Sequence, residues 1–290
     1  MKNSKTLFHD FVARVTIPES RDEIQSIAYL VFENIFGLTK SAILGEKIVS
    51  LTPELQNRLH EHLERINRSE PVQYVLGESY FYGRIFGVNP SVLIPRPETE
   101  ELVRCVIKFA RDKKKRFRIF DIGTGSGCIA ITLSLELEAV EVFGTDISSA
   151  ALTTASANAQ QLRAKVQFLN HDVLNSSLPF STDIIVSNPP YIGFDEVKTM
   201  SKNVVDYEPK EALFVGAEDP LLFYKAIVKT ARESLTPEGL LAVEINERFG
   251  KDVRRLFVAN DFCEVELIQD AFGKDRIVKG VLSSGLDYTG

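Results

Sequence analysis

The run Asp121-Ile122-Gly123-Thr124-Gly125-Ser126-Gly127-Cys128 decides the fold. It follows a short apolar strand, Phe117 to Asp121, and opens a helix, so its glycines permit a tight turn and let a ligand touch bare backbone. Asp146 ends the next strand, about 20 residues on, where a carboxylate can accept hydrogen bonds from both hydroxyls of a ribose. The turn therefore predicts a nucleoside site formed by Gly123, Thr124, Gly125, Ser126, Gly127 and Asp146.

The glycine spacing narrows the class of nucleoside ligand. It reads G-x-G-x-G, and its third glycine comes one residue too early for the dinucleotide fingerprint. The turn does not require a pyrophosphate, and a single nucleoside with an amino acid tail could lie across it. Asp172 follows a third strand-like run, Gln167 to His171, and we expect it to accept from an adenine amino group, with Val173 beside the ring.

Outward from this turn, short apolar strands alternate with helices, which predicts an α/β fold with a doubly wound, mainly parallel, Rossmann-like sheet. Two strand-like runs near the end, Phe262 to Ile268 and Ile277 to Leu282, have no helix between them and predict an antiparallel edge. The alternating segments are Phe117 to Asp121, Cys128 to Leu137, Val140 to Thr145, Ala150 to Gln161, Val166 to Leu169, Asp183 to Ser187, Pro220 to Leu235 and Gly239 to Ile245.

The first seventy residues have a different pattern. Apolar residues recur at three- and four-residue steps from Ile24 to Ile35, which predicts helices. Thr52-Pro53-Glu54 has the features of a helix start. Tyr74 to Ile94 is rich in aromatic and β-branched residues broken by glycines, which favours a β-hairpin over a helix. We expect a helical domain over residues 1–72, a β-hairpin linker over 73–95 and the nucleoside-binding domain over 96–290.

Asn188-Pro189-Pro190-Tyr191 follows the buried run Asp183 to Ser187, at the end of a strand where open α/β sheets bind ligands. The two prolines fix the backbone and remove amide donors, so local carbonyls are free to face a substrate. The Asn188 side-chain oxygen and the Pro189 carbonyl could hold the hydrogens of a planar NH2 group, aim its lone pair at a sulfonium methyl, and favour its pyramidalisation. Tyr191 can stack on the planar group. The run predicts an S-adenosylmethionine-dependent methyltransferase, with Asn188 also contacting the methyl donor.

Composition and charge argue against a nucleic acid partner. The chain carries 34 Lys and Arg against 40 Asp and Glu, a formal net charge of −6, which is the wrong sign for binding by phosphate neutralisation. Residues 1–90 hold ten basic and eleven acidic side chains. The one basic run, Arg111 to Arg118, is interpreted as a solvated loop. We therefore expect no direct DNA partner.

The remaining composition places the chain in a reducing compartment. Its apolar stretches fall far short of the ~20 residues that span a bilayer, and no apolar signal segment opens the chain, so we expect no membrane partner. His60 and His62 lie two apart on a predicted helix and are interpreted as solvated side chains, and we expect no metal. The cysteines form no C-x-x-C pair, which favours a cytoplasmic protein: Cys105, Cys128 and Cys263.

The glycine turn and the N-P-P-Y run are shared by many amino-methyltransferases, whereas Val92 to Glu100 is typical of one family. On these runs the chain resembles the HemK/PrmC family of protein-(glutamine-N5) methyltransferases. The resemblance covers about residues 71 to 245 and rests on Pro71-Val72-Gln73-Tyr74, Gly77, Phe81-Tyr82-Gly83, Val92-Leu93-Ile94-Pro95-Arg96-Pro97-Glu98-Thr99-Glu100, Asp121 to Gly127, Asp146, Ile185 to Ile192, Tyr207-Glu208-Pro209, Ala212-Leu213 and Gly216.

The resemblance implies a seven-stranded methyltransferase fold and a role in translation termination. It implies a helical amino-terminal domain that helps dock peptide chain release factors, and a glutamine in their Gly-Gly-Gln loop as the methyl acceptor. One departure is visible, because Ile245-Asn246-Glu247 stands where a glycine-containing stretch is expected.

Two other enzyme classes remain alternatives. An adenine-N6 or other nucleic acid amino-methyltransferase would use N-P-P-Y equally well, and the charge argues against it. A nicotinamide dehydrogenase is disfavoured by the glycine spacing.

Overall fold

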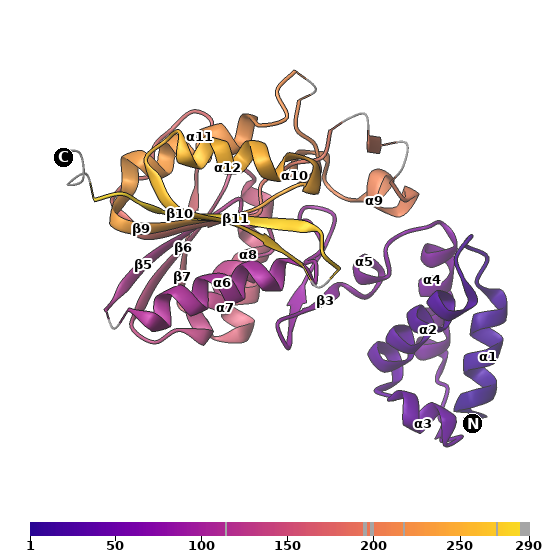
Figure 1. Ribbon diagram of the computed structural model, residues 1–290. Coiled ribbons are helices and arrows are strands. Elements are labelled where there is room, and N and C mark those ends of the chain that lie inside the picture. Colours follow the sequence, from indigo (N-terminus) through magenta and orange to yellow (C-terminus); the bar gives the residue numbers. More distant parts are fainter. Residues whose placement is uncertain (114, 194–195, 198–199, 217, 271, 285–290) are drawn as a thin grey trace. The chain divides into compact units, whose positions relative to one another are not determined.

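The computed structural model describes residues 1–113, 115–193, 196–197, 200–216, 218–270 and 272–284 (Figure 1). The chain divides into two compact units. One, the helical unit, comprises Met1–Glu78 with Ser201–Tyr207, and the other, the sheet unit, comprises Ser79–Met200 with Glu208–Gly290.

The helical unit is built around an apolar core contributed by all of its longer helices, with Phe8, Phe11 and Phe32 in edge-to-face contact. Side-chain caps start these helices. Thr52 Oγ1 accepts from Leu55 N at 3.3 Å, which confirms the predicted helix start. The elements are β1 (Lys2–Asn3), α1 (Ser4–Arg14), α2 (Arg21–Phe36), α3 (Lys40–Leu44), β2 (Ile48–Val49), α4 (Pro53–Asn67), α5 (Val72–Leu76) and α9 (Lys202–Tyr207).

Two details of this unit differ from the prediction. Gln73 to Leu76, expected in the hairpin linker, belong to helix α5, because Pro71 presets the first turn and Gly77, with φ of 74°, ends it. His62, expected to be solvated, is only 6% exposed on α4 because it shares a helix face with the core residues Leu59 and Leu63.

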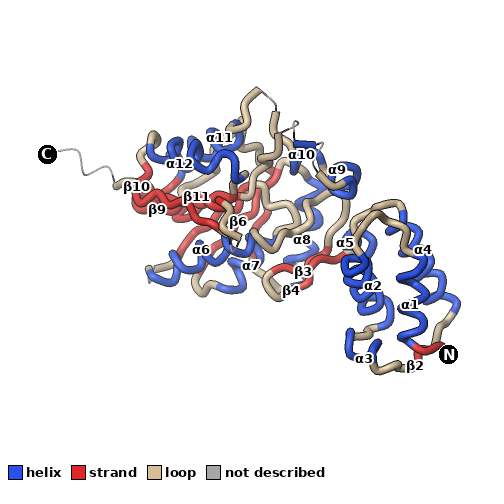
Figure 2. Tube along the Cα trace, turned by 45° about the vertical axis from the view of Figure 1, so that its right-hand side comes forward, coloured by secondary structure: helices blue, strands red, loops and turns tan. Residues whose placement is uncertain are grey.

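The sheet unit contains seven strands in one sheet, within the described residues, in the order β10-β11-β9-β8-β5-β6-β7. Figure 2 shows these strands as one twisted layer with helices packed along it. Neighbours from β9 to β7 are parallel, and β11 is antiparallel to both β9 and β10. The predicted doubly wound α/β fold with an antiparallel edge is confirmed.

The remaining elements complete the sheet unit. Tyr82 and Gly83, both with positive φ, make the tight turn between β3 and β4. The elements are β3 (Glu78–Phe81), β4 (Arg84–Gly87), α6 (Thr99–Asp112), β5 (Phe117–Ile122), α7 (Cys128–Glu136), β6 (Val140–Asp146), α8 (Ser149–Leu162), β7 (Val166–Asn170), β8 (Thr182–Ser187), α10 (Lys210–Leu213), α11 (Leu222–Ser234), β9 (Leu235–Glu244), the 3₁₀ helix η2 (Glu247–Phe249), α12 (Gly250–Val258), β10 (Phe262–Gln269) and β11 (Asp275–Leu282).

Alternate residues of the central strands face two separate cores. Ile184 and Val186 pack with α6 and α7 on one face, whereas Ile185 packs with α11 and α12 on the other. Figure 1 shows these two pairs of helices on opposite faces of the sheet. Each fully buried side chain of this kind contributes about 1.5–3 kcal/mol. Because the strands are held from both faces, their carboxyl ends form a fixed edge from which loops project.

That edge brings together the residues singled out in the sequence. Asp121 on β5 is in register with Gly144 on β6 and Val186 on β8, and Ser187 is in register with Val243 on β9. The residues that follow these strands therefore lie together at the carboxyl edge of the sheet. No described helix is both long and apolar enough to cross a membrane.

Candidate active site

The glycine turn joins β5 to α7 and lies beside the end of β6. Gly123 N and Thr124 N both donate to the Thr145 carbonyl at 2.8 Å, which fixes the turn against β6. Gly123 and Gly125 have φ of 72° and 54°, and a Cβ atom built on either would meet nothing within 4 Å. The backbone there is open, as close approach of a ligand requires.

Gly127 has a different role from the other two glycines. Its φ is 80°, and a Cβ atom there would lie 2.9 Å from Ile131 Cδ1 and 3.1 Å from Ala155 Cβ. Its absence of a side chain therefore lets α7 pack closely on α8. The neighbouring Ser126 is buried, and its carbonyl accepts from Asn158 Nδ2 at 2.9 Å.

Two carboxylates face the turn from β5 and β6. Asp146 Oδ2 accepts from Gly125 N and Oδ1 accepts from Ser148 N, each at 2.9 Å. Asp121 is fully buried and its Oδ2 accepts from Thr124 Oγ1 at 2.6 Å, while its Oδ1 has no partner among the described residues. Burial raises the pKa of both groups, that of Asp121 to about 7.

These groups fit S-adenosylmethionine. Its ribose hydroxyls and ammonium group are donors, and the turn offers open backbone together with an unpartnered buried acceptor, Asp121 Oδ1. Asp121 was not among the predicted site residues. Its place directly before the glycine run was the signal that could have identified it.

Asp172 and Val173 lie close to Asp146. His171 N donates to the Asp146 carbonyl at 3.0 Å, and Asn170 Nδ2 does so at 3.3 Å, so this turn is tied to the end of β6. Both Asp172 carboxylate oxygens accept within their own turn, from Leu174 N at 2.9 Å and Asn175 Nδ2 at 2.6 Å. Val173 packs against the core on the α11 side. Their roles beside an adenine ring stay predictions.

The tetrapeptide follows β8 at the same edge. Asn188 is half-buried and its Nδ2 donates to Thr99 Oγ1 at 3.3 Å. Asn188 Oδ1 and the Pro189 carbonyl have no hydrogen-bond partner within the part of the chain that the structure describes. Two acceptors on consecutive residues are therefore available to a ligand.

A buried carboxylate, Glu244, lies behind the tetrapeptide. Its Oε2 accepts from Thr99 Oγ1 at 2.6 Å and its Oε1 accepts from Tyr191 Oη at 3.1 Å. Glu244 is only 1% exposed, and this burial raises its pKa. Burial, followed by the nearby Glu244 charge, raises the pKa of Tyr191 well above its usual range. Sequence reasoning missed Thr99 and Glu244 as site residues, although a carboxylate ending a strand beside N-P-P-Y was a usable signal.

The chain beyond the tetrapeptide is held at its base. Ile192 N donates to the Leu213 carbonyl at 3.0 Å, and Asn246 Nδ2 donates to the Tyr191 carbonyl at 3.3 Å. Asn246 thus has a local role in the stretch where a glycine was expected.

An ion pair joins two of the runs on which the family resemblance rests, Val92 to Glu100 and Tyr207-Glu208-Pro209. The Glu208 side chain is 1% exposed, and Arg96 donates to it at 2.6 Å while Ile94 N donates at 3.3 Å. Removing one member of such a pair leaves a buried charge uncompensated, which costs about 3–5 kcal/mol. This pair fixes the segment that precedes Thr99.

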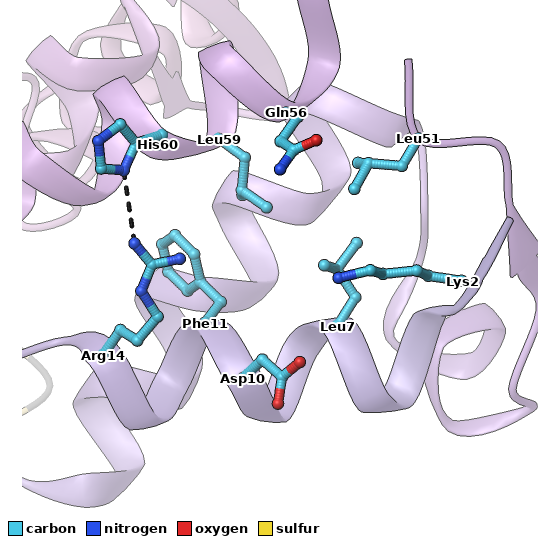
Figure 3. A pocket seen from close by; sticks show the side chains of 9 residues that line it. All are labelled: Lys2, Leu7, Asp10, Phe11, Arg14, Leu51, Gln56, Leu59 and His60. Atoms are coloured by element: carbon cyan, nitrogen blue, oxygen red, sulfur yellow. Dashed lines mark hydrogen bonds between the residues drawn. The ribbon is translucent and has the colours of Figure 1, made fainter. Parts of the chain in front are cut away.

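The helical unit contains a separate hollow of about 230 Å³ (Figure 3). Its floor is apolar, and Arg14 and His60 approach each other across it at 3.4 Å. None of the predicted site residues lines this hollow, and no group of three or more potential metal ligands occurs among the described residues. It is lined by Lys2, Leu7, Asp10, Phe11, Arg14, Leu51, Gln56, Leu59 and His60.

Comparisons with known proteins match both units. The PrmC N-terminal domain model matches residues 13–77 and the Methyltransferase small domain model matches residues 102–211. A release factor glutamine methyltransferase of Bacteroides thetaiotaomicron is 43% identical over 89% of this chain and 92% of its own length. One of Flavobacterium psychrophilum is 39% identical over 96% of this chain and 98% of its own. A methyltransferase structure from Pyrococcus furiosus, 15% identical, matches 80% of this chain and all of its own with a TM-score of 0.51, which shows the fold alone.

Proposed function

Because the chain belongs to the release factor glutamine methyltransferase family, we propose that it transfers a methyl group from S-adenosylmethionine to the side-chain amide nitrogen, N5, of the glutamine in the Gly-Gly-Gln loop of peptide chain release factors. One observation carries the chemistry. Asn188 Oδ1 and the Pro189 carbonyl are adjacent acceptors without a partner among the described residues.

A primary amide fits this pair of acceptors. Its nitrogen carries two hydrogens and is a weak nucleophile because its lone pair is delocalised into the carbonyl. Acceptance of both hydrogens by Asn188 and Pro189 fixes the direction of the lone pair and favours the pyramidal nitrogen of the transition state. Pro190 keeps the backbone rigid behind them. When bound, S-adenosylmethionine supplies an electrophilic methyl group on a sulfonium leaving group.

The residues that would hold the methyl donor are those of the glycine turn and the strand ends beside it. Gly123 and Gly125 offer open backbone, and Asp146 retains lone pairs for ribose hydroxyls beyond those that accept Gly125 N and Ser148 N. Asp121 offers its unpartnered Oδ1 to a donor. We assign the adenine end to Asp172 and Val173, because their turn is tied to the Asp146 carbonyl.

The partner proposed here is a protein rather than a nucleic acid or a membrane. The chain's formal charge of −6 opposes binding to a phosphate backbone. Release factors act in the cytoplasm, so a cytoplasmic location follows from the same proposal.

A methylation assay tests the function. The purified enzyme with S-adenosylmethionine should add one methyl group to the Gly-Gly-Gln glutamine of a release factor, located by tryptic mass mapping, and should leave duplex DNA and free glutamine unmodified. Asn188→Ala should lower turnover by about 10²–10³-fold, the usual cost of one oriented transition-state contact. Its affinity for S-adenosylmethionine should change far less.

Two opposite results would contradict this proposal. Efficient methylation of duplex DNA with an untouched glutamine would replace this proposal by the adenine alternative. Near-normal turnover by folded Asn188→Ala would show that the tetrapeptide is structural.

A further inference from the structure

Asn188 can serve a substrate amide only if its oxygen, and not its nitrogen, faces that substrate. A carboxamide has an acceptor and two donors on groups of nearly equal size, so its shape alone does not select an orientation. The reversed side chain would point N–H groups at the N–H groups of the glutamine. Some neighbouring group must therefore fix the Asn188 amide.

We propose that Thr99 and Glu244 fix it, as positioning residues that act through Asn188, an inference that rests on the proposed function. An ionised carboxylate accepts hydrogen bonds and donates none. Thr99 Oγ1, 2.6 Å from Glu244 Oε2, therefore commits its single hydrogen to Glu244. Only lone pairs of Thr99 remain for Asn188, so Asn188 Nδ2, at 3.3 Å, must be the donor and Oδ1 must lie on the opposite side.

Glu244 is itself held from a second side. Tyr191 Oη donates to Glu244 Oε1 at 3.1 Å, so each carboxylate oxygen receives one hydroxyl hydrogen. Burial raises the pKa of Glu244, whereas these two hydroxyl donors and the nearby Arg276 guanidinium lower it. In the ionised form, which accepts from both hydroxyls at once, Glu244 is a pure acceptor, and the direction of each hydrogen bond from Glu244 through Thr99 to Asn188 is determined.

The fold accounts for the meeting of these residues. Register between Ser187 on β8 and Val243 on β9 places the following residues, Asn188 and Glu244, side by side. Thr99 is the first residue of α6 and is itself only 2% exposed. Strand β9 thus supplies the acceptor Glu244, α6 supplies the Thr99 hydroxyl, and the segment after β8 supplies the Asn188 amide.

Three substitutions test the chain of hydrogen bonds from Glu244 through Thr99 to Asn188. Thr99→Val keeps the shape and removes the hydroxyl, so Asn188 can adopt either orientation. Glu244→Gln brings its own N–H donors, which can free the Thr99 hydrogen to bond Asn188 Oδ1. Both should lower kcat for release factor on the order of 10²-fold, the effect of misplacing a reacting group. The Kd for S-adenosylmethionine, by calorimetry, should stay within about twofold of the wild type. Thr99→Ser, which keeps the hydroxyl, should restore kcat.

A matched control separates this effect from loss of a buried hydroxyl in general. Thr132 on α7 is fully buried, and its Oγ1 has no partner among the described residues. Thr132→Val should leave kcat and KM unchanged. On an Asn188→Ala background, Thr99→Val should cause no further loss of kcat, because its effect passes through Asn188.

Several outcomes would overturn the inference. They are wild-type kcat in Thr99→Val, failure of folded Thr99→Ser to restore kcat, or a rise in the S-adenosylmethionine Kd that accounts for the whole loss in Thr99→Val. If Glu244→Gln does not fold, the Thr99 pair decides alone. Inactive Asn188→Ala with normal Thr99→Val would refute only this inference, whereas active Asn188→Ala would refute the catalytic assignment on which it rests.

Discussion

Asp146 is tied by its own carboxylate to the turn that would receive the methyl donor. Its oxygens accept from Gly125 N and Ser148 N, which orients the group at the end of β6. Asp146→Ala removes the acceptor for the ribose hydroxyls and loosens the turn. Loss of two charge-assisted bonds costs on the order of 3 kcal/mol, so the Kd for S-adenosylmethionine should rise about a hundredfold, measured by calorimetry.

Asp183 provides the control for this prediction. It lies near the start of β8, at the opposite end of the strand from Asn188, and accepts from Arg118 N and Lys115 Nζ. Asp183→Ala should leave the Kd unchanged. An unchanged Kd in Asp146→Ala would remove Asp146 from the cofactor site.

At the residue scale, the sequence predicts what depends on position along one strand and its loop. Asp146 and Asn188 are predicted as site residues because Asp146 ends one apolar strand and Asn188 follows another, at the carboxyl edge where such sheets bind ligands. Thr99 and Glu244 were not found as a pair. They are 145 residues apart, and their contact depends on the register of β8 against β9, which no local pattern encodes. The prediction that His62 is solvated was wrong, because residue type alone does not show which face of an amphipathic helix a histidine occupies.

At the scale of elements, α4 contains a pH-sensitive side chain. His62 is 6% exposed, and neither ring nitrogen has a partner among the described residues. Burial, then Arg58 and Arg65, lower its pKa below the usual value. The unfolded chain binds the proton more readily, so stability is complete above about pH 6.5 and is lost as the pH falls below it. The loss is at most about 1.4 kcal/mol per pH unit.

His62→Leu should remove this pH dependence of unfolding. Hydrogen exchange of α4 amides between about pH 5 and 7.5 would measure local opening in the helical unit rather than in the sheet unit. His9→Gln, at an exposed histidine of α1, is the matched control and should keep the wild-type slope. If His62→Leu keeps that slope too, His62 does not cause it.

The longer elements of the sheet unit are the ones that the sequence predicts well. β5, β8 and β9 are apolar on both faces because helices cover both sides of the sheet, and such runs stand out in the sequence. The short helices α5, α9 and α10 were not predicted, and neither was the nine-residue helix α12. Helices of four to six residues lack a periodic pattern and form only where tertiary contacts or a proline support them.

At the scale of the whole molecule, we expect the two units of the chain to have different functions. The helical unit has its own apolar core, and the sheet unit has two others, one on each face of the sheet. The residues assigned to methyl transfer and donor binding all lie in the sheet unit. The helical unit also includes Ser201–Tyr207, and Tyr207 Oη donates to the Arg68 carbonyl at 2.8 Å.

Removal of residues 1–77 should therefore affect the protein substrate and spare the methyl donor. Gly77 ends α5 in a left-handed conformation, so the cut falls at the end of an element. Without the helical unit, Tyr207 loses Arg68, but the adjacent Glu208 keeps its ion pair with Arg96. Calorimetry should show a nearly unchanged Kd for S-adenosylmethionine, which also serves as the test that the shortened protein is folded.

The expected change is a rise of about tenfold or more in KM for intact release factor. Contacts far from the reacting nitrogen offset the entropy of association, on the order of several kcal/mol, and a large partner needs them more than a small one does. A short peptide containing Gly-Gly-Gln cannot reach such contacts, so its KM should be the same for the full and shortened enzymes. Steady-state methylation of both substrates by both enzymes measures this difference. An equal KM for intact release factor would mean that the sheet unit alone recognises the protein, and an equal rise for the peptide would mean that the deletion has damaged the site itself.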